Sequence, residues 1–266
     1  MEQTNDSRLM PVLFIGHGSP MNAVEENEFS RGWMEIAGTL PRPEAILCIS
    51  AHWETNGTFV TAMERPKTIH DFGGFPERLY EVSYPAPGKP ELAKEITGMI
   101  RSVPVGRDYS WGLDHGCWSV LTRMYPEAVI PVVQLSLDRS KPAQFHYDLA
   151  KELYPLRKNG ILIIGSGNMV HNLRLIAWDR MDDPAFGYDW TIEAGMKMKQ
   201  LILSGDHRNL IDYQSQGKAF GLSIPTPEHY LPLLYALALQ EEGEKTFFFN
   251  DQPSMGSLMM TSVKIG

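Results

Sequence analysis

Short apolar runs that alternate with longer amphipathic segments constrain the fold of this chain more than any other feature. The apolar runs cover residues 12–15, 45–49, 130–135 and 161–164, and they are rich in Val and Ile. Each is too short for a helix, and continuous apolarity is typical of a strand covered on both faces. Helical periodicity covers residues 28–40, 90–101, 117–124, 143–156 and 190–203. This alternation predicts an α/β fold: a single layered domain over residues 1–266, with a mainly parallel or mixed central sheet and helices on both faces.

The remaining segments yield more local predictions. A further helix is expected to start after Pro227, with Thr226 as its cap, and to run to Leu239. Residues 246–249 and 257–265 are expected to form two strands, as a hairpin at the sheet edge. Residues 53–90 are interpreted as a long irregular connection that could roof a site. Residues 1–10 are interpreted as a flexible N-terminal segment, because they are polar and carry no signal-peptide pattern.

Composition excludes several classes of function. The net charge is −8 with no run of Lys and Arg, which argues against a nucleic-acid partner. No apolar stretch approaches the roughly 20 residues needed to span a bilayer, so no membrane partner is expected. The two cysteines, Cys48 and Cys117, are far apart in sequence, and we expect two buried, inert thiols rather than a disulfide. Together these features favour a cytoplasmic protein.

Histidines follow the predicted strands repeatedly. His17 comes directly after the first apolar run, His52 after the second, and His171 after the run at 161–164. Ligands of open α/β sheets bind beyond the carboxyl ends of the strands. His115 and His229 stand at the starts of predicted helices and extend the pattern. Neutral imidazole is the commonest protein ligand for Zn and Fe, so this placement predicts a metal site.

Other signals are weaker. The glycines and serine at 165–167 resemble the start of a dinucleotide loop, but the third glycine is absent. The motifs of phosphate-binding loops, zincins and serine hydrolases do not occur in the sequence. His70, His146 and His207 are interpreted as surface or structural residues, and Trp111, Trp118 and Tyr230 as core or wall.

Six short motifs, taken in their order and spacing, resemble the class III extradiol ring-cleavage dioxygenases, and within them the DOPA 4,5-dioxygenase group. These motifs are Gly-His-Gly-Ser-Pro at 16–20, Ser-Ala-His-Trp at 50–53, His-Asp-Phe-Gly-Gly-Phe-Pro at 70–76, Gly-Leu-Asp-His-Gly at 112–116, Gly-Ser-Gly at 165–167 with His-Asn at 171–172, and Pro-Glu-His-Tyr-Leu-Pro at 227–232. The resemblance extends from about residue 11 to the C-terminal strands.

The resemblance implies a role for each matching histidine. His17 and His52 correspond to two metal ligands, and the third is His229 or its neighbour Glu228, with His229 favoured. His171 corresponds to the acid/base, which could also join the metal shell, and His115 to a residue that contacts substrate. The implied metal is Fe(II), although Zn(II) can occupy such a site. The implied reaction cleaves L-DOPA with O2 next to its hydroxyl groups and gives 4,5-seco-DOPA.

Two alternatives remain open from the sequence. One is a zinc-dependent hydrolase in which His17, His52 and His229 bind the metal that activates water. The other is a non-enzymatic protein that binds a metal or ligand on the same scaffold. The sequence carries no indication of oligomeric state.

Overall fold

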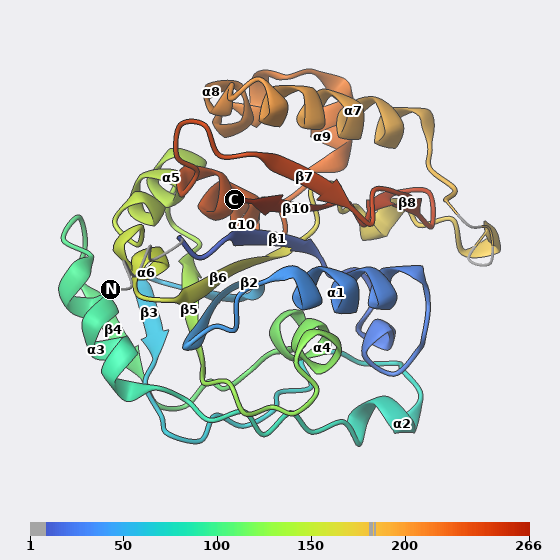
Figure 1. Cartoon of the computed structure of the whole chain (residues 1–266). Helices are drawn as coiled ribbons and strands as arrows, with labels where there is room; N and C mark the ends of the chain where they lie inside the picture. The colour runs from blue at the N-terminus through green and yellow to red at the C-terminus, as the bar shows by residue number, and fades with distance from the viewer. Residues whose placement is uncertain (1–8, 181–182, 184) are drawn as a thin grey trace, which may run out of the picture.

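A mixed sheet forms the centre of the computed structural model, which describes residues 9–180, 183 and 185–266 (Figure 1). Across this described part the sheet has eight strands, in the order β4 (Val105–Asp108), β3 (Thr58–Thr61), β5 (Val132–Asp138), β2 (Ala45–Thr55), β6 (Ile161–Gly167), β1 (Val12–Gly16), β10 (Ser262–Ile265) and β7 (Thr246–Phe249). The four middle strands, β5, β2, β6 and β1, run parallel to one another, whereas β10 is antiparallel to β1, β7 to β10 and β3 to β5. The predicted α/β class with a mixed sheet is confirmed.

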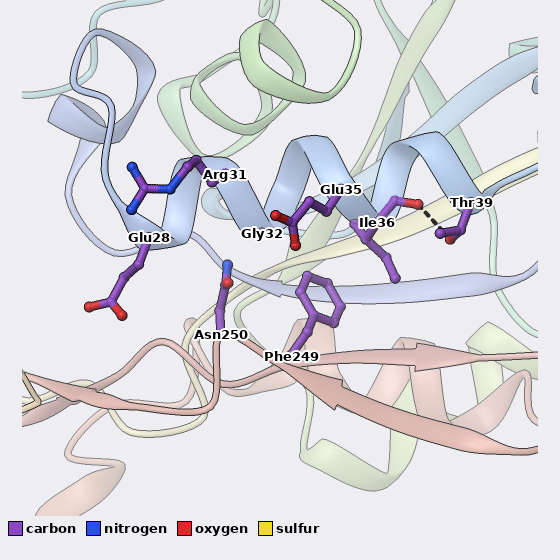
Figure 2. Close-up of a pocket in the computed structure, with 8 residues that line it drawn as sticks. All are labelled: Glu28, Arg31, Gly32, Glu35, Ile36, Thr39, Phe249 and Asn250. Carbon is purple, nitrogen blue, oxygen red and sulfur yellow. Dashed lines mark hydrogen bonds between the residues drawn. The ribbon is translucent and has the colours of Figure 1, made fainter.

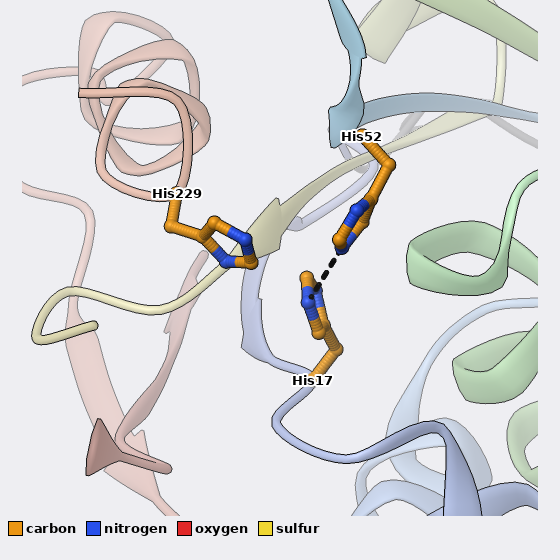
Figure 3. Close-up of side chains that lie close together, drawn as sticks. All are labelled: His17, His52 and His229. Carbon is orange, nitrogen blue, oxygen red and sulfur yellow. Dashed lines mark hydrogen bonds between the residues drawn. The ribbon is translucent and has the colours of Figure 1, made fainter. Parts of the chain in front are cut away.

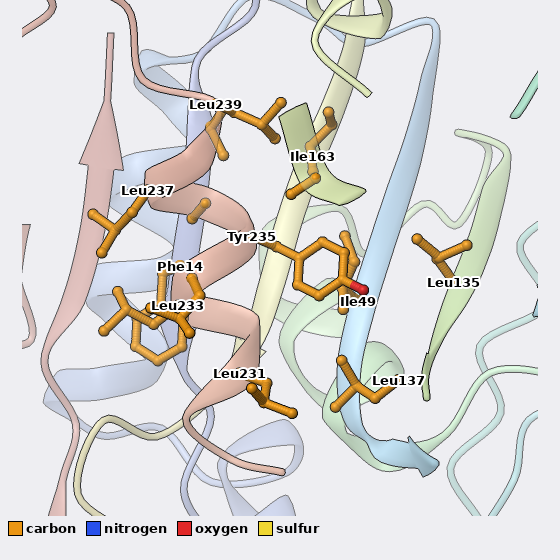
Figure 4. Packing of buried hydrophobic residues seen from close by; sticks show 14 of the residues in the cluster. Phe14, Ile49, Leu135, Leu137, Ile163, Leu231, Leu233, Tyr235, Leu237 and Leu239 are labelled. Atoms are coloured by element: carbon orange, nitrogen blue, oxygen red, sulfur yellow. The ribbon is translucent and has the colours of Figure 1, made fainter. Parts of the chain in front are cut away.

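Both faces of the sheet are covered, because successive side chains of a strand point in opposite directions. In β1, Val12 and Phe14 belong to one buried cluster, and Leu13 and Ile15 to the other. The first cluster includes residues of α3 (Pro90–Met99), α5 (Ala143–Lys151), α7 (Asp189–Leu203), α9 (Lys218–Ser223) and α10 (Leu231–Ala238). The second includes residues of α1 (Glu28–Thr39), α2 (Glu77–Tyr80) and α4 (His115–Met124). Figure 4 shows α10 packed over the sheet, with Tyr235 between the side chains of the parallel strands.

Short elements complete the chain. They are η1 (Pro20–Ala23), α6 (Pro155–Lys158), η2 (Leu173–Leu175), η3 (Trp178–Arg180), α8 (His207–Ile211), η4 (Tyr213–Ser215), β8 (Pro253–Ser254) and β9 (Leu258–Met259). Within the described part of the chain, no helix combines the length and apolarity that a bilayer crossing requires. Residues 1–8 of the expected flexible N-terminal segment lie outside the described residues, whereas Met10 is buried and hydrogen-bonded to Arg157.

Several predicted boundaries were wrong. Strand β2 does not end at residue 49 but continues to Thr55 through an irregularity in its pairing with β5, so His52 lies inside the strand. Polar residues after Ile49 interrupt the apolar run, so the sequence pattern did not indicate that the strand continues. The connection 53–90 is not wholly irregular, because it contains β3 and α2. Both are only four residues long, and elements of this length carry little periodicity.

The C-terminal third also differs from the prediction. Helix α10 begins at Leu231, and Thr226 does not cap it but donates a hydrogen bond to Glu228. Residues 227–230 form a turn instead, in which the Tyr230 N–H donates to the Pro227 carbonyl. The segment 257–265 is divided into β9 and β10, and β10 lies between β1 and the edge strand β7. The antiparallel pairing of β10 with β7 at the sheet edge was predicted correctly.

Candidate active site

Three histidines from distant parts of the sequence turn toward one point at the carboxyl end of the parallel strands (Figure 3). His17 follows β1, His52 lies in β2, and His229 precedes α10. The Nε2 atoms of His17 and His52 are 3.1 Å apart. One ring nitrogen of each of the three histidines lies within 4.8 Å of the others. These three side chains could therefore hold a metal ion.

Glycines at the strand ends let the backbone segments of the site approach one another. A Cβ on Gly167 would lie 2.1 Å from the His229 carbonyl oxygen, and one on Gly16 would lie 2.5 Å from the Met260 carbonyl oxygen. The His17 N–H donates to the Gly167 carbonyl, and the Asn168 N–H donates to the His229 carbonyl. The turn before α10 thus lies directly against the end of β6, which brings His229 to His17.

A hydrogen-bond chain determines which nitrogen of His17 carries the proton. The Ser166 hydroxyl donates to the Gly116 carbonyl oxygen at 2.6 Å, and His17 Nδ1 lies 2.9 Å from the same hydroxyl. A hydroxyl has one proton to donate, so Ser166 accepts from His17. We therefore assign the proton to Nδ1 of His17, which leaves its Nε2 lone pair facing the site.

Asp71 is a site residue that the sequence reasoning missed, although it stands in the quoted motif at 70–76. Its carboxylate accepts from the His115 N–H at 2.8 Å and from His115 Nδ1 at 2.9 Å. It also lies 3.5 Å from His52 Nδ1. A carboxylate can only accept hydrogen bonds, so the His115 ring carries its proton on Nδ1 and presents Nε2 as an acceptor. The ring centroids of His115 and His52 are 3.8 Å apart.

Helix α4 holds His115 in place. Asp114 caps the helix by accepting from the Cys117 N–H, and it is itself bound by the Ser50 hydroxyl and the Gln134 amide. A Cβ on Gly116 would lie 2.9 Å from the His52 ring. The first turn of α4 therefore packs directly against His52, which accounts for the glycine after His115.

His171 lies beside the three converging histidines. Its ring stacks on His229 with a centroid distance of 3.5 Å and an interplanar angle of 11°. One possible ligand atom from each of His171, Glu228 and His229 lies within 4.8 Å of the other two. Among the described residues, His171 forms no such group with His17 and His52. Of the two candidates for the third metal ligand, His229 is the one that lies with His17 and His52.

Burial keeps four histidines neutral: His17, His52, His171 and His229. It lowers the pKa of His17 well below 6.5, with further contributions from His52 and His115. Burial also lowers the pKa of His52 to about 3 and that of His171 to about 4. The pKa of His229 is likewise lowered by burial and by His171. Neutral imidazoles have a free lone pair, which is the form that binds a metal.

The residues fit a metal cation. The Nε2 atom of His17 is a hydrogen-bond acceptor that lies 3.1 Å from Nε2 of His52. A cation bound between these two nitrogens could be coordinated by both rings once His52 carries its proton on Nδ1, the nitrogen that lies 3.5 Å from Asp71. His229 Nδ1 is also buried and has no hydrogen-bond partner among the described residues. The clustered imidazoles therefore favour a positively charged ligand that the protein itself does not supply.

A surface cavity lies away from these histidines. It has a volume of about 500 Å³ and lies between α1 and the end of β7 (Figure 2). Its lining consists of Glu28, Arg31, Gly32, Glu35, Ile36, Thr39, Phe249 and Asn250. Because it has no histidine, cysteine or paired catalytic group, we place the chemistry at the histidines instead.

The other histidines and the aromatic residues that the sequence analysis named make hydrogen bonds and packing contacts within the fold. His70 bonds the Val82 carbonyl, His146 bonds the Tyr235 hydroxyl and His207 bonds the Tyr147 hydroxyl. Trp118 and Tyr230 are buried in the core, and Trp111 stacks on Trp53. Both cysteines are buried and free, as predicted.

Comparison with known proteins gives one consistent result. Residues 11–255 match the family described as the catalytic LigB subunit of aromatic ring-opening dioxygenase. The chain is 48% identical to the 4,5-DOPA dioxygenase extradiol of Escherichia coli (strain K12), over 98% of this chain and 96% of the relative. It is 35% identical to the protein of that name from Beta vulgaris, over 98% of both chains.

A solved structure is also similar. The crystal structure of the uncharacterized protein JW3007 from Escherichia coli K12 superposes with a TM-score of 0.83 at 43% identity, covering 97% of this chain and 100% of that one. The chain therefore belongs to the LigB family of aromatic ring-opening dioxygenases, which confirms the predicted enzyme class over the hydrolase and binding-protein alternatives.

Proposed function

We propose that this enzyme opens the ring of a catechol next to its hydroxyl groups, with L-DOPA as the substrate and O2 as the co-substrate, to give 4,5-seco-DOPA. The observation that carries the proposal is the convergence of His17, His52 and His229, all neutral and all at the carboxyl end of the sheet. The names of the bacterial and plant relatives support the choice of substrate.

His17, His52 and His229 are the proposed metal ligands, and Fe(II) is the proposed metal. Three protein ligands leave part of the coordination sphere free for other molecules. When bound, the metal would supply the redox-active, Lewis-acidic centre that ring opening with O2 requires. Zn(II) can bind the same imidazoles, so the metal found after purification need not be the active one.

His171 and His115 are the proposed proton-handling and substrate-contacting residues. His171 is half-buried and neutral at pH 7, so a ring nitrogen can accept a phenolic proton from a catechol and later return it. His115 presents Nε2 as an acceptor, because its Nδ1 proton is bound by Asp71. It can therefore receive a hydrogen bond from a substrate hydroxyl. Neither task requires His17, whose Nδ1 proton is bound by Ser166.

The test is an oxygen-uptake assay with a metal-defined enzyme. The metal-free protein is loaded anaerobically with Fe(II), then mixed with O2 and a panel of catechols that includes L-DOPA. We expect oxygen consumption, a new visible absorbance and a product whose mass equals that of L-DOPA plus O2. Protein loaded with Zn(II) serves as the control. Absence of oxygen uptake with every catechol in the panel would refute the proposed function.

His171→Ala tests the assignment of the proton carrier. We expect turnover to be lost while catechol affinity, measured by equilibrium binding in the absence of O2, is largely retained. Loss of binding and turnover together would contradict a role confined to proton transfer.

A further inference from the structure

We propose that Ser166 is a positioning residue of the active site, which holds His17 in the one tautomer that can bind a metal through Nε2. The inference rests on the proposed function, since it assumes that His17 is a ligand. The sequence did not suggest this role for Ser166, because residues 165–167 resembled the start of a dinucleotide loop through their two glycines.

The geometry of the hydroxyl carries the argument. Ser166 is fully buried in β6, next to Ile15 of β1 and Ser50 of β2 in the strand register. Its one proton is bound by the Gly116 carbonyl at 2.6 Å. The oxygen can then only accept from His17 Nδ1, at 2.9 Å. No rotation of the hydroxyl allows it to donate to His17 without giving up the Gly116 bond.

Burial makes the Ser166 hydroxyl necessary for holding the proton on Nδ1 of His17. His17 is 1% exposed, and Ser166 has no exposed surface. Water therefore cannot readily replace the hydroxyl, and a buried Nδ1–H without a partner would lose the free energy of its hydrogen bond. The alternative tautomer of His17, with the proton on Nε2, would also direct that proton at His52 Nε2, 3.1 Å away. That proton would block metal binding by both histidines.

The same hydroxyl connects three elements of the site. It lies on β6, accepts from the residue after β1 and donates to the second residue of α4. The ring orientation of His17 is thereby coupled to the helix that carries His115. Hydrogen-bond partners of this kind around metal ligands typically change metal affinity by about 10–100-fold when removed.

The experiment compares Ser166→Ala with Ser119→Ala. Ser119 is also fully buried, and its hydroxyl has no hydrogen-bond partner among the described residues, so its removal controls for the loss of a buried hydroxyl. Zn(II) dissociation constants are measured by competition with a chromophoric chelator. We expect Ser166→Ala to weaken Zn(II) binding by about 10–100-fold and Ser119→Ala to leave it within about twofold. Ser166→Thr, which keeps the hydroxyl, should restore most of the affinity.

A second readout needs no metal. Long-range nitrogen–proton NMR correlations of the imidazole rings report the tautomer of His17 in the metal-free protein. We expect a single Nδ1-protonated form in the wild type and a mixture of tautomers in Ser166→Ala. A wild-type His17 protonated on Nε2, or equal losses of affinity in the alanine variants of Ser166 and Ser119, would overturn the proposal.

His17→Ala separates this inference from the proposed function. If His17→Ala abolishes tight Zn(II) binding but Ser166→Ala changes neither affinity nor tautomer, only the role of Ser166 is refuted. If His17→Ala leaves Zn(II) binding unchanged, the proposed ligand set is refuted, and the role of Ser166 with it.

Discussion

Replacing Asp71 by Asn should reverse the hydrogen-bonding character of His115. Asp71 accepts two hydrogen bonds from His115, one from the backbone N–H at 2.8 Å and one from ring Nδ1 at 2.9 Å. Although burial raises it, these hydrogen bonds hold the pKa of Asp71 below its usual value, so the group is a carboxylate. An Asn side chain that keeps the backbone bond through its oxygen must direct its NH2 group at Nδ1. The ring proton would then move to Nε2, which faces the site.

The expected loss of activity follows from the hydrogen bond between the Asp71 carboxylate and His115 Nδ1, which the substitution removes. A hydrogen bond to a charged group contributes about 1.5–3 kcal/mol, and each 1.4 kcal/mol corresponds to about tenfold in rate. We therefore expect kcat/KM for L-DOPA to fall by about 10- to 150-fold in Asp71→Asn, by this conversion. Asp148→Asn, at an exposed position on α5, should have no effect.

The assay is oxygen uptake by Fe(II)-loaded enzyme, with bound metal quantified for each variant. Metal content must be matched, because Asp71 also lies 3.5 Å from His52 Nδ1. NMR of the metal-free variant should show His115 protonated on Nε2. An Asp71→Asn enzyme with kcat/KM within about twofold of wild type at equal metal content would refute the reasoning.

Two further predictions concern pH and the strand ends. Because burial lowers the pKa of His171 from 6.5 to about 4 and that of His52 to about 3, the unfolded chain binds more protons below pH 6.5. The free energy of unfolding of the metal-free protein should therefore fall as the pH drops from 6.5 toward 4, by up to about 1.4 kcal/mol per pH unit for each histidine. The free energy of unfolding, measured with urea at a series of pH values, should depend less steeply on pH in His171→Gln than in the wild type. An equal pH dependence in both would contradict an origin in the buried histidine. Gly167→Ala should weaken Zn(II) binding by about 10–100-fold, because the new Cβ would lie 2.1 Å from the His229 carbonyl oxygen. Gly98→Ala in α3, where a Cβ meets no atom within 4 Å, should leave chelator competition unchanged, and an equal loss in both variants would argue against a local effect.

The sequence determined the parts of the fold that depend on local patterns. The runs at 12–15 and 161–164 are strands, and periodicity located α1 and α7 to within a residue or two. It also singled out His17 and His171 as candidate site residues, because a histidine that closely follows a buried strand is visible without knowing the partner strands. The short β3 and β4 were missed, since four residues are too few to show a period.

Only the tertiary structure decided how these residues act together. Asp71 is 44 residues from His115, and Ser166 is 149 residues from His17. Their hydrogen bonds arise from the packing of α4 and the parallel pairing of β6 with β1. Sequence patterns report how a residue relates to its neighbours within about two helical turns. The protonation state of a buried imidazole depends instead on which atoms surround it after folding, so it could be read only once the sheet had brought those atoms together.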